Sequence, residues 1–216
     1  QARRGLATAI DGLMKPSVSR WFWMKAQDEA LNEDDECKRY FDAVGDAMWN
    51  SIYNPAAGFI PQSNCVDNDI ATFGLGYLWI GERRDRSGLL FKSLFIGDVA
   101  IDENADGQID TAYVCRRFTA RQASQIWKRE GQLGEKVRES LNSTNKADKD
   151  KKFEFVECIT PRYDYDSRAK DNKNLPFSQE IICVEDEYIV EESGYHEFPI
   201  ACPRWELVPG QIYPRS

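Results

Sequence analysis

The spacing of apolar residues changes near Tyr77, and this change restricts the fold more than any other feature of the chain. Before Tyr77, apolar residues recur every three or four positions, as on one face of a helix. After it, apolar and polar residues alternate over short runs separated by turn-forming residues, which is typical of strands joined by hairpins. This order predicts an α+β fold, in which helices pack on mainly antiparallel β-hairpins.

Two helices are predicted in the first third of the chain. The first follows a polar, acidic start at 32–36, which favours a helix N-terminus, and it ends at Asn54-Pro55. The second ends at Gly74. We expect the apolar stripes of both helices to pack into the core of the protein. These stripes consist of Cys37, Tyr40, Phe41, Val44 and Met48 in the first helix and of Val66, Ile70 and Phe73 in the second.

Strands and shorter helices are predicted in the rest of the chain. Thr119-Ala120-Arg121-Gln122 has the pattern of a capping box, so a helix should begin there, and another short helix is expected around Val137 and Leu141. The charged connector at 142–152 is a candidate subdomain border. The strand-like runs lie at 77–81, 89–96, 109–118, 153–159, 179–184, 188–191 and 196–202.

The composition indicates a globular protein without a surface built to grip nucleic acid. Of the 216 residues, 42% are hydrophobic and 12% are aromatic, which is enough for a sizeable core. The net charge of -8 argues against tight phosphate binding. The sequence contains no run of about 18 apolar residues, so it predicts no membrane-spanning helix. Aspartates dilute two basic clusters, which we interpret as solvated turns or faces. The clusters are Arg83, Arg84 and Arg86, and Lys146, Lys149, Lys151 and Lys152.

The cysteines are scattered along the chain without the CxxC spacing that is typical of metal sites. A chain of this size and apolar content does not need a disulfide framework. We therefore expect buried free thiols and synthesis in a reducing cytosol. The six positions are 37, 65, 115, 158, 183 and 202.

The segment 102–110 has the ligand spacing of a calcium-binding loop, with Gly107 at the position of the sharp turn. However, Tyr113 stands where a bidentate Glu normally completes such a site, and strand-like runs flank the loop instead of helices. We therefore favour a tight turn between two strands and predict no metal site, while a calcium-binding interaction module is the alternative function. The candidate ligands are Asp102, Asn104, Asp106 and Asp110.

Residues that could support catalysis are sparse. His196 is the only histidine, which leaves no pair of imidazoles for metal binding or acid–base chemistry. Asp164 and Asp166 lie in a polar loop, where alternating carboxylates usually belong to a solvated turn. The sequence contains no GxSxG, P-loop or dinucleotide-binding motif. It therefore predicts no catalytic residue, no cofactor and no enzymatic activity.

An aromatic stretch near the N-terminus contains Trp21, Phe22 and Trp23. Two interpretations are open. The stretch could fill the core of its own domain, or it could be an arm that packs on a neighbouring subunit, because large aromatic side chains dominate interface energetics. These three residues are the interface candidates of the chain.

Several short segments together form a pattern that spans nearly the whole chain. They are Ser19-Arg20-Trp21-Phe22, Phe73-Gly74-Leu75-Gly76, Asp106-Gly107-Gln108-Ile109-Asp110-Thr111, Thr119-Ala120-Arg121-Gln122, Glu192-Ser193-Gly194-Tyr195-His196-Glu197-Phe198-Pro199 and Pro203-Arg204-Trp205. In this order and at about this spacing they resemble the head-to-tail connecting (portal) proteins of short-tailed, podovirus-like bacteriophages. The best-matched stretches are Gly74–Gly76, the capping box at Thr119 and Ser193–Trp205.

The resemblance implies a structural protein. Residues 1–216 would be the wing-like N-terminal region of a portal subunit, beginning and ending inside a longer protein whose stem, clip and crown are absent here. The subunit would join a dodecameric, homo-oligomeric ring at a capsid vertex. Double-stranded DNA would pass through this ring non-specifically during genome packaging and ejection.

The resemblance also implies partners and a location. The partners are the packaging terminase, the scaffold and coat proteins and the tail adaptor, with no membrane involved. The protein would reside in the virion after synthesis in the bacterial host cytoplasm. No catalytic residue carries over, and the visible roles in the matched segments are turns, a helix cap and packing. The sequence departs from the family at Pro214, where the family tends to have Gly.

Overall fold

The computed structural model describes residues 1–83, 85–129, 131–166, 168 and 171–214. Within this part of the chain, helices and antiparallel sheets form two compact units. The first unit combines Gln1–Ile96 with Ile200–Ser216, and the second consists of Gly97–Pro199. The predicted α+β class is confirmed. No helix of the described residues is long and apolar enough to cross a bilayer.

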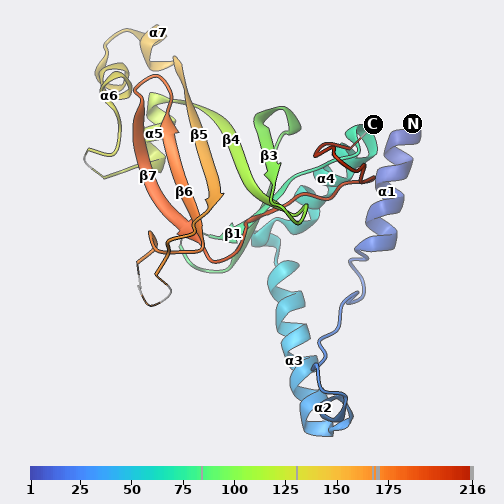
Figure 1. Cartoon of the computed structure of the whole chain (residues 1–216). Coiled ribbons are helices and arrows are strands. Elements are labelled where there is room, and N and C mark those ends of the chain that lie inside the picture. The colour runs from blue at the N-terminus through green and yellow to red at the C-terminus, as the bar shows by residue number, and fades with distance from the viewer. Residues whose placement is uncertain (84, 130, 167, 169–170, 215–216) are drawn as a thin grey trace. The chain divides into compact units, whose positions relative to one another are not determined.

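The first unit contains four α-helices within the described residues (Figure 1). They are α1 (Ala2–Met14), α2 (Glu29–Glu33), α3 (Asp35–Ile52) and α4 (Phe59–Phe73). Both helices predicted in this region are present. Asp34 caps α3, because its side chain accepts hydrogen bonds from the N–H groups of Glu36 and Cys37. Gly74 ends α4 in the left-handed conformation at φ 73, as predicted.

The strands of the first unit form an antiparallel sheet in the order β2-β1-β8, counted over the described residues. They are β1 (Leu78–Glu82), β2 (Leu89–Ser93) and β8 (Ile200–Ala201), so the C-terminal segment returns to complete this sheet. Helix α4 packs against β2, and buried Phe59, Val66 and Phe91 contribute to the shared core. This core fixes α4 on the sheet and leaves α3 to be stabilised by other contacts.

The apolar stripes of α3 and α4 differ in burial. Helix α4 buries Val66, as predicted, and also Phe59, whereas Ile70 is half-buried and Phe73 is 42% exposed. In α3, where every residue is described, Gly45 is the one buried residue, while Tyr40 is 65% exposed and Met48 is 40% exposed. Cys37, Phe41 and Val44 are half-buried, so the predicted core packing of α3 holds only in part. The physical reason is that the helix packed most closely on α3 is α2, which is only five residues long.

The second unit is built on an antiparallel sheet in the order β3-β4-β5-β6-β7, again counted over the described residues. Its strands are β3 (Val99–Glu103), β4 (Ile109–Thr119), β5 (Lys152–Pro161), β6 (Phe177–Cys183) and β7 (Tyr188–Tyr195). Four of these strands were predicted, with ends that differ by a few residues. Strand β3 was missed because it overlaps the acidic segment that was interpreted as a turn.

Among the residues described in this unit, three short helices accompany the sheet: α5 (Ala120–Ile126), α6 (Glu135–Asn142) and α7 (Lys146–Lys149). The predicted capping box opens α5, with the Thr119 hydroxyl accepting from the Gln122 N–H and the Gln122 side chain accepting from the Thr119 N–H. Trp127 packs on Phe155 with ring centroids 4.7 Å apart, so α5 and its C-terminal end cover one face of the sheet. The connector 142–152 lies inside this unit, between α6 and β5.

All six cysteines lie in the described part of the chain and are free thiols, as predicted. Their predicted burial holds for Cys183 alone among them. Cys65 is exposed, and Cys37, Cys115, Cys158 and Cys202 are partly exposed.

Candidate interaction surfaces

Residues 15–28, here called the arm, run from α1 to α2, and Arg20 attaches them to α3. The Arg20 guanidinium lies 2.8 Å from the Asp42 carboxylate and 3.0 Å from that of Asp46, and it also donates to the Asp42 carbonyl oxygen at 3.0 Å. It crosses α3 over Gly45, where a Cβ atom would collide with it. The glycine inside this helix, which costs helix stability on its own, thus makes room for Arg20.

The aromatic residues of the arm join a row that reaches the core of the first unit. The Trp21 indole N–H donates to the Tyr53 hydroxyl at 2.9 Å. The Phe22 ring lies 6.3 Å from that of Trp49, which stacks on Tyr53 at 3.9 Å between centroids. Trp21 and Phe22 therefore contact their own unit, although Trp21 is 38% exposed and does not fill its core.

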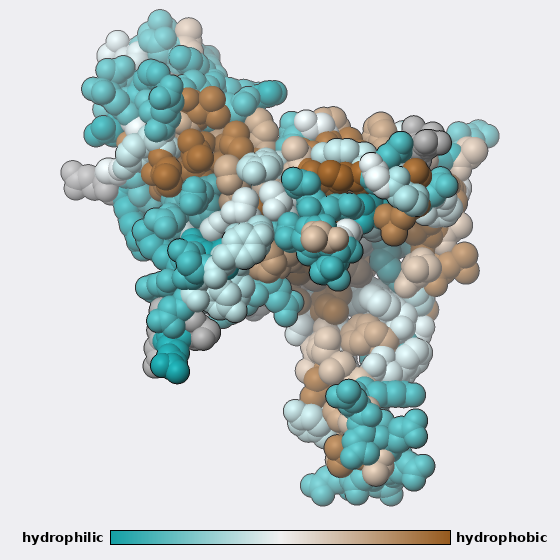
Figure 2. Space-filling model, in the orientation of Figure 1, coloured by the Kyte–Doolittle hydropathy of each residue, from teal (hydrophilic) through white to brown (hydrophobic). Residues whose placement is uncertain are grey.

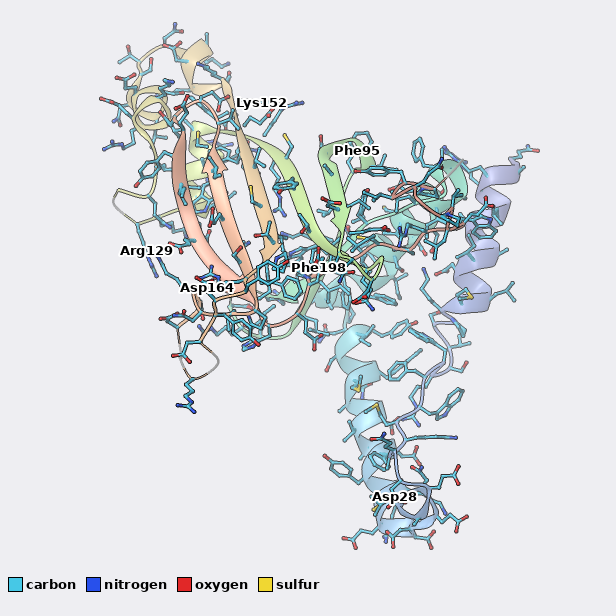
Figure 3. The ribbon with its side chains drawn as sticks, viewed as in Figure 1. Asp28, Phe95, Arg129, Lys152, Asp164 and Phe198 are labelled. Atoms are coloured by element: carbon cyan, nitrogen blue, oxygen red, sulfur yellow. The ribbon has the colours of Figure 1, made fainter. Side chains whose placement is uncertain are left out.

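Trp23 differs from its neighbours because it is 67% exposed. The role of Trp21, Phe22 and Trp23 in a subunit interface stays a prediction. We call α2, α3 and the arm together the helical hairpin, and Asp28 lies at its far end (Figure 3). Leu31 and Tyr40 add to its exposed apolar area, at 47% and 65% exposure. The hairpin thus presents several large apolar side chains to solvent.

Acidic residues gather at one end of the helical hairpin, although the hairpin as a whole, residues 15–52, has a net charge of only -3. Residues 28–46 include eight Asp or Glu and two Lys or Arg, a net charge of -6, compared with -8 for the whole chain. Apart from the pairs that involve Arg20 and the Lys38–Asp35 pair at 3.5 Å, the carboxylates at this end are solvated or cap helices. The surface is therefore both apolar and strongly acidic.

The sheet of the second unit has a second apolar surface, on the face away from α5. A continuous row of directly paired residues crosses four strands of this open sheet face. The next pair along the strands is Tyr113 and Cys158. Figure 2 shows hydrophobic side chains gathered over these strands. The row consists of Cys115, Val156, Ile182 and Ile189.

On the opposite, helix-covered face of this sheet, a buried charge ties four strands together. Glu157 is 3% exposed, and its carboxylate lies 2.7 Å from the Arg116 guanidinium and accepts a hydrogen bond from the Tyr195 hydroxyl at 3.2 Å. The Gln179 amide donates to Glu157 and, at 2.8 Å, to the Tyr195 hydroxyl. This arrangement compensates the buried carboxylate, as stable burial of a charge requires.

Glycine is required at two positions in the segments that resemble the portal family, because other atoms lie too close for a Cβ atom. At Gly194 a Cβ atom would lie 2.6 Å from the Phe177 carbonyl oxygen, and at Gly76 it would lie 2.7 Å from the Val66 side chain. Gly74 also accepts a hydrogen bond from the Trp205 N–H at 2.8 Å, so two matched segments far apart in sequence lie side by side. These positions therefore have structural roles.

The segment 102–110 is the tight turn that the sequence favoured. The Asn104 side-chain oxygen accepts from the N–H groups of Asp106 at 2.9 Å and Gln108 at 3.0 Å, and Gly107 adopts φ 75. The oxygen that a calcium ion would need at this position is thus used by the turn. No group of three His, Cys, Asp or Glu side chains suited to a metal exists among the described residues, so nothing there supports the calcium alternative.

The residues considered for catalysis lie on exposed loops. His196 is in an exposed bend after β7 and not in a strand. Asp166 accepts from the N–H of Arg168 at 2.9 Å, as in a solvated turn. Asp164 borders an open depression that it shares with Arg162, Glu180 and Glu192 (Figure 3). The structure does not bring His196 together with the two aspartates in any described contact.

The two basic clusters belong to a turn and a short helix. Arg83 donates to the Ala56 carbonyl oxygen at 3.1 Å and lies 3.4 Å from the Asp85 carboxylate, whereas Arg84 lies outside the described residues. Lys146 and Lys149 are exposed on α7. These environments agree with the interpretation as solvated surface.

Comparison with known proteins gives a match over the whole chain. The sequence profile described as "Bacteriophage head to tail connecting protein" matches residues 1–216. The chain belongs to this family. The portal protein of Salmonella phage epsilon15 is 24% identical over 217 residues, which cover 100% of this chain and 38% of that protein. The probable portal protein of Bordetella phage BPP-1 is 28% identical over 128 residues, or 57% of this chain and 22% of that protein.

The resemblance predicted from the short segments is thereby confirmed, and the connector chain spans well under half the length of these relatives. Portal proteins are oligomeric structural components of the phage virion. Sequence reasoning missed the Arg20 contact across Gly45, the exposure of Tyr40 and Met48 on α3, and the open sheet face. The many acidic residues at 28–46 could have indicated the solvent exposure of α3. The apolar residues at alternate positions of β5 could have indicated the open sheet face.

Proposed function

We propose that this connector chain is the wing-like N-terminal region of a portal subunit. Twelve such subunits would form a ring at one capsid vertex, and double-stranded DNA would pass through the ring during packaging and ejection. The observation that carries this proposal is the family match over residues 1–216. The stem, clip and crown would belong to the rest of the subunit.

The surface properties support a role as a structural conduit. The helical hairpin and the open sheet face expose apolar side chains that a monomer would not be expected to leave in water. The net charge of -8 disfavours tight DNA binding, which suits a channel that DNA must traverse in both directions. We propose no enzymatic activity for the chain.

The proposed partners follow from the same function. Besides further copies of the subunit, they are the packaging terminase, the scaffold and coat proteins and the tail adaptor. We place synthesis in the host cytoplasm, and the free thiols agree with a reducing compartment.

The native mass of the whole parent protein tests this proposal. We expect a single closed oligomer of about ten or more copies, since a ring built from one repeated interface closes at a fixed number. A monomer or dimer that persists at high protein concentration would overturn the proposed function.

A further inference from the structure

A hollow of about 300 Å³ opens between the end of α5 and the start of α6. Two buried side chains line it, Trp127 at 4% exposure and Leu133 at 7%. Lys128, Arg129 and Arg138 line the same hollow, and all three are exposed (Figure 3 labels Arg129). Ligand-binding pockets start at about this volume, so the hollow is large enough for one side chain of a bound segment.

The loop that forms the hollow is fixed to strand β7. The Tyr188 hydroxyl donates to the Gly131 carbonyl oxygen at 2.7 Å, and the Gln132 amide donates to the Val190 carbonyl oxygen at 3.3 Å. Within the loop, the Gln132 side chain also accepts a hydrogen bond from the Arg129 N–H at 3.0 Å. These bonds hold the loop in place before a ligand arrives, which lowers the entropic cost of binding.

The basic side chains of the hollow are available to a ligand. Among the described residues, no ion pair involves Lys128, Arg129 or Arg138. In the same part of the chain, Arg138 makes one hydrogen bond, from Nε to the Gly134 carbonyl oxygen at 3.4 Å, and this acceptor is neutral. The positive charges are therefore not neutralised by contacts within the described structure.

Carboxylates of β7 and of the turn before it hold other groups. Glu191 accepts from the Trp127 indole N–H at 2.7 Å, and Asp186 caps α6 by accepting from the Lys136 N–H at 2.9 Å. Residues 121–138 include five Lys or Arg and two Asp or Glu, a net charge of +3 in a chain whose net charge is -8. The hollow thus combines an apolar lining with local positive charge.

We propose that this hollow binds a short acidic peptide segment of a partner protein. An apolar side chain of the segment would pack on Trp127 and Leu133, and carboxylates on either side of it would pair with Lys128, Arg129 and Arg138. Charge complementarity identifies this occupant, because it favours the correct partner and fixes its register. The two guanidinium groups also match the geometry of carboxylates.

The same features argue against nucleic acid as the occupant. Bases of single strands stack on accessible aromatic rings, whereas Trp127 is buried. Duplex DNA is held by many basic contacts along its phosphates, and three basic side chains around one hollow of an acidic chain provide few. A discrete acidic peptide therefore fits this surface better. The inference goes beyond the proposed ring, because peptide binding at this site does not depend on ring closure.

Calorimetric titration of the whole parent protein tests the site. The probe is the peptide acetyl-Glu-Glu-Leu-Glu-Glu-amide, and the neutral peptide acetyl-Gln-Gln-Leu-Gln-Gln-amide is the ligand control. We expect the acidic peptide to bind at one site per subunit and to bind more weakly as the salt concentration rises. The neutral peptide should bind at least about tenfold more weakly, because it cannot pair with the basic side chains.

Substitutions locate the binding in the hollow. Lys128→Gln and Arg138→Gln should each raise the Kd about two- to fivefold, the range expected for the loss of one exposed ion pair, and the double variant should raise it about tenfold. Arg121→Gln is the matched control, because Arg121 is exposed on α5 outside the lining of the hollow, and it should leave the Kd unchanged. Since all three side chains are exposed, thermal unfolding should hardly change.

The outcomes separate the site from the function. Absence of binding, equal binding of both peptides, or an equal effect of Arg121→Gln and Arg138→Gln would overturn the proposed site. A random-sequence DNA duplex that binds more tightly than the peptide through Lys128 and Arg138 would also overturn it. These results would leave the portal function standing. A monomeric parent protein that binds the peptide through Lys128 and Arg138 would support the site and overturn the ring.

Discussion

Replacing Glu157 with Gln removes the charge at the centre of the network that joins β4, β5, β6 and β7 while keeping the shape of the side chain. The Glu157 side chain is 4% exposed, and that of Arg116 is 30% exposed. The change weakens the charge-assisted bond to Arg116 and turns an acceptor for Gln179 and Tyr195 into a competing N–H donor.

The expected cost follows from these contacts. A hydrogen bond to a charged group contributes about 1.5–3 kcal/mol, but water can partly replace the lost partner of Arg116, so we assign about 1 kcal/mol to it. The buried donor facing the Gln179 amide adds about 1 kcal/mol. The total of about 2 kcal/mol corresponds to a decrease in Tm of about 4–8 °C for a chain of this size.

Urea unfolding followed by circular dichroism measures this loss, and Glu180→Gln is the matched control. Glu180 lies on β6 and borders the open depression on the other side of the sheet, so its replacement should change the free energy of unfolding by less than about 0.5 kcal/mol. If Glu157→Gln is as stable as the unsubstituted protein, or if both variants lose the same stability, the argument from the buried charge is wrong.

Three further predictions concern the caps and thiols. Thr119→Ala should lower the free energy of unfolding by about 1 kcal/mol in urea titration, because the capping box is lost, whereas Thr119→Ser should retain most of it. Hydrogen bonds from the N–H groups of Cys37 and Glu36 lower the pKa of Asp34. The stabilisation of α3 by Asp34 is therefore present above its ordinary pKa and is lost as the pH falls through the lowered pKa. Circular dichroism should show that Asp34→Asn loses less helix than the unsubstituted protein between about pH 5 and 2. Burial raises the pKa of Cys183 from 9.0 to about 11, so the stability of the fold should decrease as the pH rises from 9.0 toward 11. A thiol reagent at about pH 8 should label exposed Cys65 in the native state and Cys183 only after unfolding. Native labelling of Cys183 as fast as that of Cys65 would contradict its burial.

The elements that could be predicted from the sequence are those with local signals. The capping box at Thr119, the glycine that ends α4 and the turn around Asn104 each depend on residues within a few positions of one another. Alternation along residues 109–116 likewise identified strand β4. Strand β3 escaped because its acidic end has the composition of a turn, and only pairing with β4 makes it a strand.

The candidate surfaces depended on long-range contacts and could not be predicted in the same way. Periodicity showed which face of α3 is apolar but not whether anything covers it. The contact of Arg20 with Asp42 and Asp46 across Gly45, and the network around Glu157, join residues from separate elements. Neither leaves a pattern in a single stretch of sequence.

The return of the C-terminal segment to the first unit affects the order in which the protein can fold during synthesis. The sheet of the second unit is complete once β7 has left the ribosome at Tyr195. The sheet of the first unit must wait for β8 at Ile200–Ala201, although its helices and β1 were made long before. The part synthesised first is therefore finished last, and its exposed β1 edge must be protected until then.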